Sequence, residues 1–326
     1  MLANCPMNCV IRAGMDEVGY APTLGPLVVG CMAVAVPEGL GSADLWDALS
    51  SAAARSSDKA GDRIQVDDSK LIMRGPNGFK RLETNVLALL EAFDIPLGTA
   101  WELFEFAAEM DYHRISRYPW YWPGDFLLPV QASKEEIERK AALMRAALKN
   151  ASIGPGEVRL LVIFADELNR SCLKTDNKAV VLAQAAAQFL AKLFKEPAPL
   201  RIAVDKHGGR DRYDAFLAGV FPFVPIRVIE QGSRISRYVI GIGQKRAEID
   251  FMQGADRADF LAAAASMVSK YVRELFMKAF NIFWRSQVPG LKPTAGYPLD
   301  AKRFLYETRL ARKRLGIPDE MMVRER

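Results

Sequence analysis

Hydrophobic positions fall into two kinds of pattern along the chain, continuous apolar runs and repeats with helical spacing. Two long runs cover residues 10–15 and 27–36, and the segment between them contains Gly19, Pro22, Gly25 and Pro26. β-Branched runs separated by turn residues predict a hairpin of two buried strands. Shorter apolar runs predict four more strands, at residues 158–164, 201–204, 226–229 and 238–242.

Repeats with helical spacing predict the helices. Apolar residues recur at intervals of three or four in six segments: 44–55, 79–93, 133–150, 177–194, 258–280 and 300–315. This spacing places them on one face of a helix, and Ser133 is well placed to cap the third of these helices. An antiparallel pair of strands followed by alternating helices and strands predicts an α/β fold, in which helices cover the faces of a mixed sheet.

Length and composition fit a globular protein. The chain has 326 residues, 50% hydrophobic and 25% charged, enough for one large α/β domain with an added segment. The apolar run at residues 24–36 is too short to span a membrane, and the first twelve residues lack the basic and apolar regions of a secretory signal. We therefore expect a cytoplasmic protein without membrane contact. We also expect free thiols at all four cysteines, Cys5, Cys9, Cys31 and Cys172.

Basic residues concentrate near the end of the chain. The formal net charge is +5, and residues 291–326 hold nine Lys or Arg against five Asp or Glu, a surplus of four. Such a segment is typical either of a tail that contacts nucleic-acid phosphates or of a solvated helix face.

An aromatic stretch also has two interpretations. Its members are Tyr118, Trp120, Tyr121 and Trp122, and they lie among Pro119, Pro123 and Pro129. Aromatic rings on a stiff loop can stack on unpaired bases. A hydrophobic lid over the core is the interpretation we favour.

Four acidic residues lie beside predicted strands and helices. Asp16 and Glu17 end the first strand, Asp205 ends a later one, and Asp256 precedes the helix at 258–280. Isolated acids at such places are often surface caps, but carboxylates that converge repel one another and need cations. Mg²⁺ prefers oxygen ligands, and two such ions on a phosphodiester activate the attacking water and stabilise the leaving oxygen. Neighbouring strand residues point to opposite faces, so a shared site requires either that the strand bends or that one side chain reaches round it. Gly19 makes a local bend possible.

The residues around these acids are similar to the ribonuclease HII and HIII family. The segment 14–19, Gly-Met-Asp-Glu-Val-Gly, and the turn at 24–29 resemble the family's opening strand and its Gly-Pro turn. Further matches follow in family order: Asp68-Ser69-Lys70, Asp166-Glu167-Leu168-Asn169, Val204-Asp205, Ser266 in an Ala-Ala-Ser motif ten residues after Asp256, and Gly296-Tyr297-Pro298. Together they span residues 11–300 and leave 93–153 largely uncovered.

The resemblance implies an RNase H-like fold, a C-terminal helical extension and a two-ion mechanism. It implies four metal-binding catalytic residues, Asp16, Glu17, Asp205 and Asp256. It also implies a set of substrate-binding residues, Gly19, Tyr20, Ala21, Lys70, Ser266, Lys270 and Tyr297. From the residues themselves, Lys70 and Lys270 are either phosphate contacts or solvated side chains. Small side chains recur at helical spacing at 262, 265, 266 and 269. We therefore expect this helix to lie close to the sheet and to bring Asp256 near Asp16.

The sequence departs from the family in the loop expected to hold the substrate. Where the family has Gly-Arg-Gly or Gly-Thr-Gly, this chain has Gly19-Tyr20-Ala21. Tyrosine lacks the fixed fork of donors that arginine offers a phosphate, and alanine adds a Cβ where the backbone approaches a sugar. The family's later threonine and histidine are Leu299 and Lys302 here, and Lys206 follows Asp205 where HII enzymes have glycine.

These patterns predict an enzyme with two parts. We expect an RNase H-like catalytic domain at residues 1–285, with an insertion around 93–153, and a basic helical extension at 286–326. The expected activity is endonucleolytic cleavage of the RNA strand of RNA–DNA hybrids with two Mg²⁺ or Mn²⁺ ions. Two alternatives are a nucleic-acid-binding protein on the same fold that lacks catalysis, and another RNase H-like nuclease that acts on DNA or structured RNA.

Overall fold

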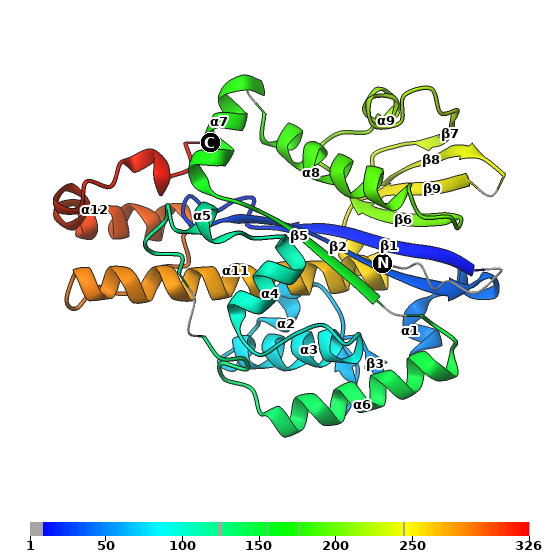
Figure 1. Cartoon of the computed structure of the whole chain (residues 1–326), viewed down its shortest axis with the longest axis horizontal. Helices are drawn as coiled ribbons and strands as arrows, with labels where there is room; N and C mark the ends of the chain where they lie inside the picture. The colour runs from blue at the N-terminus through cyan, green and yellow to red at the C-terminus, as the bar shows by residue number, and fades with distance from the viewer. Residues whose placement is uncertain (1–8, 123–125, 155, 176, 244, 326) are drawn as a thin grey trace.

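A seven-stranded mixed sheet forms the centre of the molecule (Figure 1). The computed structural model describes residues 9–325 apart from 123–125, 155, 176 and 244. β1 is antiparallel to β2 and parallel to β6, and β6 is parallel to β9. The expected mixed sheet is thus confirmed. Its strands lie in the order β5 (Gly156–Ile163), β2 (Leu27–Pro37), β1 (Cys9–Val18), β6 (Leu200–Asp205), β9 (Lys245–Met252), β8 (Ile235–Ile242) and β7 (Ile226–Gln231).

Alternation along β1 gives the sheet a buried side chain on both faces. Ile11, Ala13 and Met15 point into one hydrophobic core, and Val10 points into the other. The first core is covered by α7 (Ala165–Thr175), α8 (Lys178–Leu193) and α9 (Asp214–Val220), and the second by the long helix α11 (Phe260–Gln287). β1 is therefore packed from both sides of the sheet, and so is the end of the strand where Asp16 and Glu17 lie.

α11 lies unusually close to β1 and β2, as its small residues predicted. A Cβ on Gly14 would sit 2.0 Å from the backbone nitrogen of Ala262, and one on Gly30 would sit 2.3 Å from the Oγ of Ser269. Real Cβ atoms do not approach other atoms so closely, so glycine on the strands and small residues on the helix are both required. Asp259 caps the helix by accepting hydrogen bonds from the N–H groups of the first turn.

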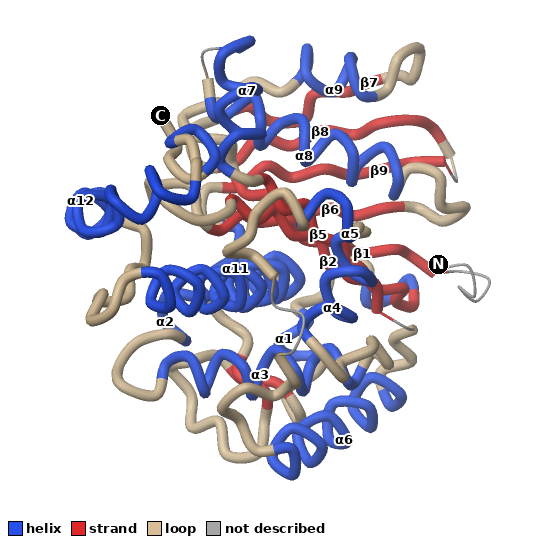
Figure 2. The backbone as a smooth tube through the Cα atoms, turned by 60° about the vertical axis from the view of Figure 1, so that its left-hand side comes forward, coloured by secondary structure: helices blue, strands red, loops and turns tan. Residues whose placement is uncertain are grey.

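A helical layer covers the outer side of α11 (Figure 2). Its largest members, α3 (Gly78–Ala92) and α6 (Lys134–Asn150), pack against each other, and α3 packs against α11. Ser133 caps α6 as expected, by accepting a hydrogen bond from the N–H of Glu136. The smaller elements are α1 (Leu45–Ala48), α2 (Ser69–Ile72), α4 (Ala100–Ala108), α5 (Tyr112–Ile115) and a two-stranded sheet of β3 (Ala53–Ala54) and β4 (Ile64–Gln65).

The aromatic stretch belongs to the core, as the favoured interpretation predicted. Tyr118, Trp120 and Tyr121 are at most 2% exposed, and Trp120 lies against Trp284 of α11. Trp122 is about half exposed and contacts other rings at the surface. Buried rings of this kind cannot stack on bases, so the stretch is a lid that joins the helical layer to the sheet.

Two expectations are corrected. The helix expected at 44–55 ends after one turn at Ala48, because residues 50–52 form turns and Ala53 and Ala54 pair with β4. Cys9 is disulfide-bonded, so the cysteines are not all free thiols. Cys31 and Cys172 are free and buried, and Cys5 lies outside the described residues.

The chain closes with α10 (Ala255–Ala258), α11, α12 (Pro298–Leu315) and a short 3₁₀ turn at Asp319–Met321. Another 3₁₀ turn, Glu38–Leu40, follows β2. In the described part of the chain, every helix is too short or too polar to cross a membrane.

Candidate active site

Four acidic residues from three segments meet at one edge of the sheet. β1, β6 and β9 are parallel, so their carboxyl ends lie at the same edge. Asp16 and Asp205 each lie one residue beyond the last pair of the β1–β6 ladder. After β9 the chain turns directly into α10, which carries Asp256 to the same edge. The topology therefore converges residues that are far apart in the sequence.

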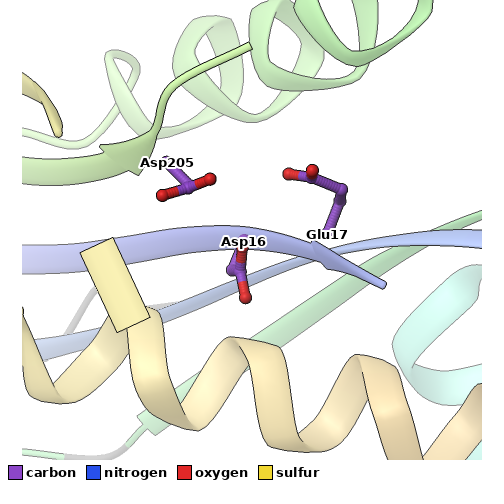
Figure 3. Close-up of side chains that lie close together, drawn as sticks. All are labelled: Asp16, Glu17 and Asp205. Atoms are coloured by element: carbon purple, nitrogen blue, oxygen red, sulfur yellow. The ribbon is translucent and has the colours of Figure 1, made fainter. Parts of the chain in front are cut away.

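Asp16 and Glu17 reach one site although they are neighbours on a strand. They leave β1 on opposite sides, with Asp205 beside them at the end of β6 (Figure 3). One oxygen from each of the three residues lies within 4.8 Å of the others. Both residues are still paired with β2 in a regular ladder that runs to Val18, and Gly19, with a φ of +94°, comes after them. The unbroken register favours a side chain that reaches round the strand over a bend between the two residues.

Asp256 lies at the rim of this group. The Oδ1 of Asp205 accepts a hydrogen bond of 2.9 Å from the N–H of Ala255. The third acid thus tethers the turn that carries the fourth. Asp256 is near enough to raise the pKa of Asp16 by its charge, as the close packing of α11 on the sheet led us to expect.

Burial and mutual repulsion raise the pKa values of these carboxyl groups. Burial, and then Glu17 and Asp205, raise the pKa of Asp16 well above its ordinary value. Burial and then Asp205 raise the pKa of Glu17 to about 7. Burial, and then Asp68 and Asp205, raise the pKa of Asp256 to about 6. Removal of the protons leaves a cluster of like charges that cations stabilise.

The donor set fits hard divalent cations. All four side chains offer carboxylate oxygens, which Mg²⁺ and Mn²⁺ prefer. Oxygens on opposite sides of one Mg²⁺ ion are separated by about 4.2 Å, slightly less than the 4.8 Å limit of this cluster. Carboxylates that are shared between two ions about 3.5–4 Å apart need no closer approach. The residues therefore fit hard divalent cations, and the number of ions stays a prediction.

Lys70 places a positive charge beside the acidic cluster. Its ammonium group lowers the pKa values of Glu17, Asp205 and Asp256, so it lies near all three. Asp68 caps the start of α2 by accepting a hydrogen bond of 2.8 Å from the N–H of Lys70. This cap fixes the backbone from which the lysine side chain extends.

Two α11 residues border the same space. Ser266 hydrogen-bonds to Asp16 and lies 3.1 Å, Oγ to Oγ, from Ser69. The Nζ of Lys270 donates a hydrogen bond of 2.6 Å to the Oε1 of Glu274. Part of the charge of Lys270 is therefore offset within the helix.

A single cleft of about 290 Å³ contains every site residue that the sequence predicted. Its walls also include Asp68, Ser69 and Arg257. The structure thus brings the whole predicted set together, and their roles in metal or substrate binding stay predictions. The members of that set are Asp16, Glu17, Gly19, Tyr20, Ala21, Lys70, Asp205, Asp256, Ser266, Lys270 and Tyr297.

Tyr20 stands at the mouth of the cleft. It is 37% exposed, and its ring lies 5.6 Å from the Nζ of Lys178 at the start of α8. Burial and the charge of Glu17 raise the pKa of the Tyr20 hydroxyl. A neutral hydroxyl that lies near Glu17 is able to donate a hydrogen bond to a substrate oxygen.

Lys206 has a structural role that explains its departure from the family pattern. It is buried, and its Nζ donates hydrogen bonds to the carbonyl of Arg210, to Asp211 and to Ser236. The side chain therefore ties the loop after β6 to the turn before β8 and does not project into the cleft.

Part of the basic charge on α12 is already paired. Arg303 bonds to Asp300 and Glu307, and Arg312 bonds to Asp319. The other basic residues of the helix are exposed and have no ion-pair partner among the described residues: Lys302, Arg309, Lys313 and Arg314. A phosphate contact from this helix stays a prediction, centred on these four residues.

Three further cations near the site were not predicted from the sequence. Arg257 donates a hydrogen bond of 3.1 Å to Asp68, Lys178 lies over Tyr20, and Arg324 binds the loop after β1. Arg257 follows Asp256 directly in the sequence, and its place next to a predicted site residue could have identified it. The other two reach the site only through tertiary packing.

Similarity to known proteins is found among solved structures. No family model matches the sequence, and neither does any curated protein. Among solved structures, ribonuclease HII in the PCNA:RNase HII complex from Archaeoglobus fulgidus is 15% identical, with a TM-score of 0.42, over 97% of this chain and 95% of that one. Ribonuclease H2 from Pyrococcus horikoshii is 14% identical, with a TM-score of 0.40, over 96% and 92%. Bst-RNase HIII in complex with Mn²⁺ is 16% identical, with a TM-score of 0.40, over 100% and 69%. At this level of similarity, function has to be inferred from the residues of the cleft.

Proposed function

We propose that the protein is a metal-dependent endonuclease that cuts the RNA strand of RNA–DNA hybrids. The observation that carries the proposal is the convergence of four acids from β1, β6 and α10 with Lys70 in one open cleft. Mutually repelling carboxylates at a surface cleft serve no packing purpose, and each raises the cost of ionising the others. Cation binding at the cleft accounts for their proximity.

Asp16, Glu17, Asp205 and Asp256 would hold two divalent ions. Ions bound there would supply an activated water and stabilise the leaving oxygen of a phosphodiester. The chain's own groups orient the ligands, because Ser266 bonds to Asp16 and the N–H of Ala255 bonds to Asp205. A hydrogen bond to a carboxylate that binds a metal fixes the direction of its ligand oxygen.

Cations around the acids would bind the backbone of the nucleic acid. Lys70 and Arg257 line the cleft itself, Lys178 lies next to Tyr20 at its mouth, and Tyr297 adds an exposed ring. An RNA strand paired with DNA offers phosphates at regular spacing and 2′-hydroxyls in a wide minor groove. Backbone contacts and hydroxyl contacts of this kind match the polar lining of the cleft.

A substrate panel tests the proposal. Purified protein is incubated with an RNA–DNA hybrid, single-stranded RNA, duplex RNA and duplex DNA, with Mg²⁺, with Mn²⁺ or with EDTA. We expect cleavage of the hybrid alone, and only with a divalent ion. Binding without cleavage in every condition would favour a non-catalytic nucleic-acid-binding protein. Cleavage of DNA or duplex RNA would identify a different nuclease on this fold.

A further inference from the structure

A buried arginine from the end of the chain binds the loop that borders the cleft. Arg324 is 4% exposed and lies beneath residues 19–25. Its guanidinium donates hydrogen bonds to the carbonyls of Gly19 and Gly25, and to that of Pro22 at 3.3 Å. Its backbone N–H donates a hydrogen bond of 2.9 Å to the carbonyl of Thr23. A single residue therefore contacts four positions of this loop.

A second buried arginine supports the same loop. Arg273 of α11 is 1% exposed, and it donates hydrogen bonds to the carbonyls of Leu24 and Ala295 at 3.3 and 3.2 Å. Burial, and then the charge of the nearby Arg273, lower the pKa of Arg324 to about 9. Arg324 therefore stays charged at neutral pH, and the loop rests on its positive charge beside that of Arg273.

These two charges are poorly compensated. Among the described residues, no carboxylate lies within 4 Å of the Arg324 guanidinium, and Arg273 has only Glu274 at 3.6 Å. The Nε atoms of both arginines are buried without a hydrogen-bond partner in the described structure. Buried charge that lacks a counter-ion is costly to keep, so its position behind the cleft calls for a functional explanation.

The loop turns its donors away from the arginines. A trans peptide directs its C=O and N–H in opposite directions. Because the carbonyl of Gly19 points to Arg324, the N–H of Tyr20 in the same peptide points away from it. The N–H groups of Tyr20 and Ala21 have no acceptor among the described residues. Tyr20 and Ala21 both line the cleft, and a backbone N–H that lacks a partner there is a hydrogen-bond donor for an anion.

We propose that Arg324, with Arg273 beside it, positions and charges this loop for a substrate phosphate. The inference rests on the proposed function, because it assumes that nucleic acid enters the cleft. Arg324 holds the carbonyls of the loop inward and leaves the N–H groups of Tyr20 and Ala21 free for the substrate. Its guanidinium also makes the electrostatic potential at these N–H groups more positive. It thereby supplies, from beneath the loop, the positive charge that Tyr20 cannot carry. Arg324 is thus a positioning residue, and the end of the chain is part of the substrate-binding site.

Three variants separate charge from loop shape. Arg324→Gln removes the charge and keeps an amide donor, Arg324→Lys keeps the charge when binding is measured at pH 6, and Lys149→Gln removes one exposed charge from α6, far from the cleft. Binding of a fluorescent RNA–DNA hybrid is measured in EDTA, so that cleavage plays no part. We expect Arg324→Gln to raise the Kd about tenfold, while Arg324→Lys and Lys149→Gln stay within about threefold of the unchanged protein.

A second measurement uses the unchanged protein, in case Arg324→Gln does not fold. The amide resonances of Tyr20 and Ala21 are followed by NMR during titration with the hybrid, and both are expected to shift. Equal Kd values for all variants, or unmoved resonances on a bound protein, would overturn this inference and leave the proposed nuclease intact. Arg324-dependent binding by a protein that never cuts the hybrid would support the inference and refute the nuclease activity. A protein that binds no hybrid, either in EDTA or with a divalent ion, would refute both.

Discussion

At the scale of single residues, Tyr20 and Ala21 are where this protein departs furthest from the ribonucleases it resembles. Tyr20 presents a ring and a neutral hydroxyl at the mouth of the cleft, and Ala21 is exposed beside it. Neither offers the charge-assisted pair of hydrogen bonds that arginine forms with a phosphate. Binding through a single 2′-hydroxyl is therefore expected to be weak. A continuous RNA strand supplies further contacts at neighbouring positions.

We predict that the protein cuts a hybrid with several consecutive ribonucleotides well and a single ribonucleotide in duplex DNA poorly. Tyr20→Arg with Ala21→Gly should narrow this gap by roughly ten- to hundredfold, the effect of one recovered charge-assisted contact in the transition state. The measurement is the ratio of the two cleavage rates for each protein. Efficient cleavage at a single ribonucleotide by the unchanged protein would show that Tyr20 substitutes for the arginine.

The sequence was sufficient to choose these residues but not to explain how they cooperate. Asp16 and Glu17 could be selected because they end an apolar strand, and the glycine after them made a bend possible. Whether two neighbours on opposite sides of a strand share a site depends on where Asp205 lies, and that position follows from strand pairing. Arg324 gave no signal in the sequence, because its partners lie about 300 residues earlier in the chain.

At the scale of elements, the contact of α11 with the sheet sets the position of the site. Gly14 lies two residues before Asp16, and a Cβ there would overlap the backbone of α11. We predict that Gly14→Ala lowers the free energy of unfolding by about 3 kcal/mol, since neither backbone can yield easily. Gly39→Ala is the control, because a Cβ at Gly39 meets no atom within 4 Å. Urea unfolding of both variants measures the difference, and equal stability would mean that α11 moves away without cost.

Elements with a strong pattern were predicted well, and those with a mixed pattern were not. α3, α6 and α8 begin and end within about a residue of the expected ranges. β9 was missed although its buried residues, Ala247, Ile249 and Phe251, alternate with polar ones, the pattern of a strand with one buried face. In the segment 44–55, the apolar residues fit a helix locally, but pairing of Ala53 and Ala54 with β4 prevails.

At the scale of the whole molecule, the raised pKa values of the acidic cluster couple folding stability to pH. The pKa of Glu17 is raised from its ordinary 4.5 to about 7, so the folded protein holds a proton there that the unfolded chain releases. The associated stability is present below pH 4.5 and is lost as pH rises toward 7. In EDTA at pH 8, Glu17→Gln should therefore be more stable than the unchanged protein, by about 1 to 3 kcal/mol.

That difference should shrink as the pH falls to about 5.5, because Glu17 is then protonated and resembles glutamine. Mg²⁺ or Mn²⁺ at pH 8 should stabilise the unchanged protein more than the variant, because the ions bind only the folded state. Thermal unfolding across this pH range is the measurement, with the exposed Glu138→Gln as the control. If the difference in stability between the unchanged protein and Glu17→Gln does not change with pH, the pKa of Glu17 is not raised by the cluster.

The most direct test of the central claim is the rate at which the protein and its Asp16→Asn variant cut a uniform RNA–DNA hybrid. Asp47→Asn serves as the control, because Asp47 is exposed on α1 and lies outside the cleft. We predict cleavage by the unchanged protein and by Asp47→Asn only with Mg²⁺ or Mn²⁺. Asp16→Asn should fold normally and lose at least about a hundredfold in rate, more than the loss of a group outside the ligand shell usually costs. An Asp16→Asn variant that cuts as fast as the unchanged protein, or cleavage that persists in EDTA, would contradict the account.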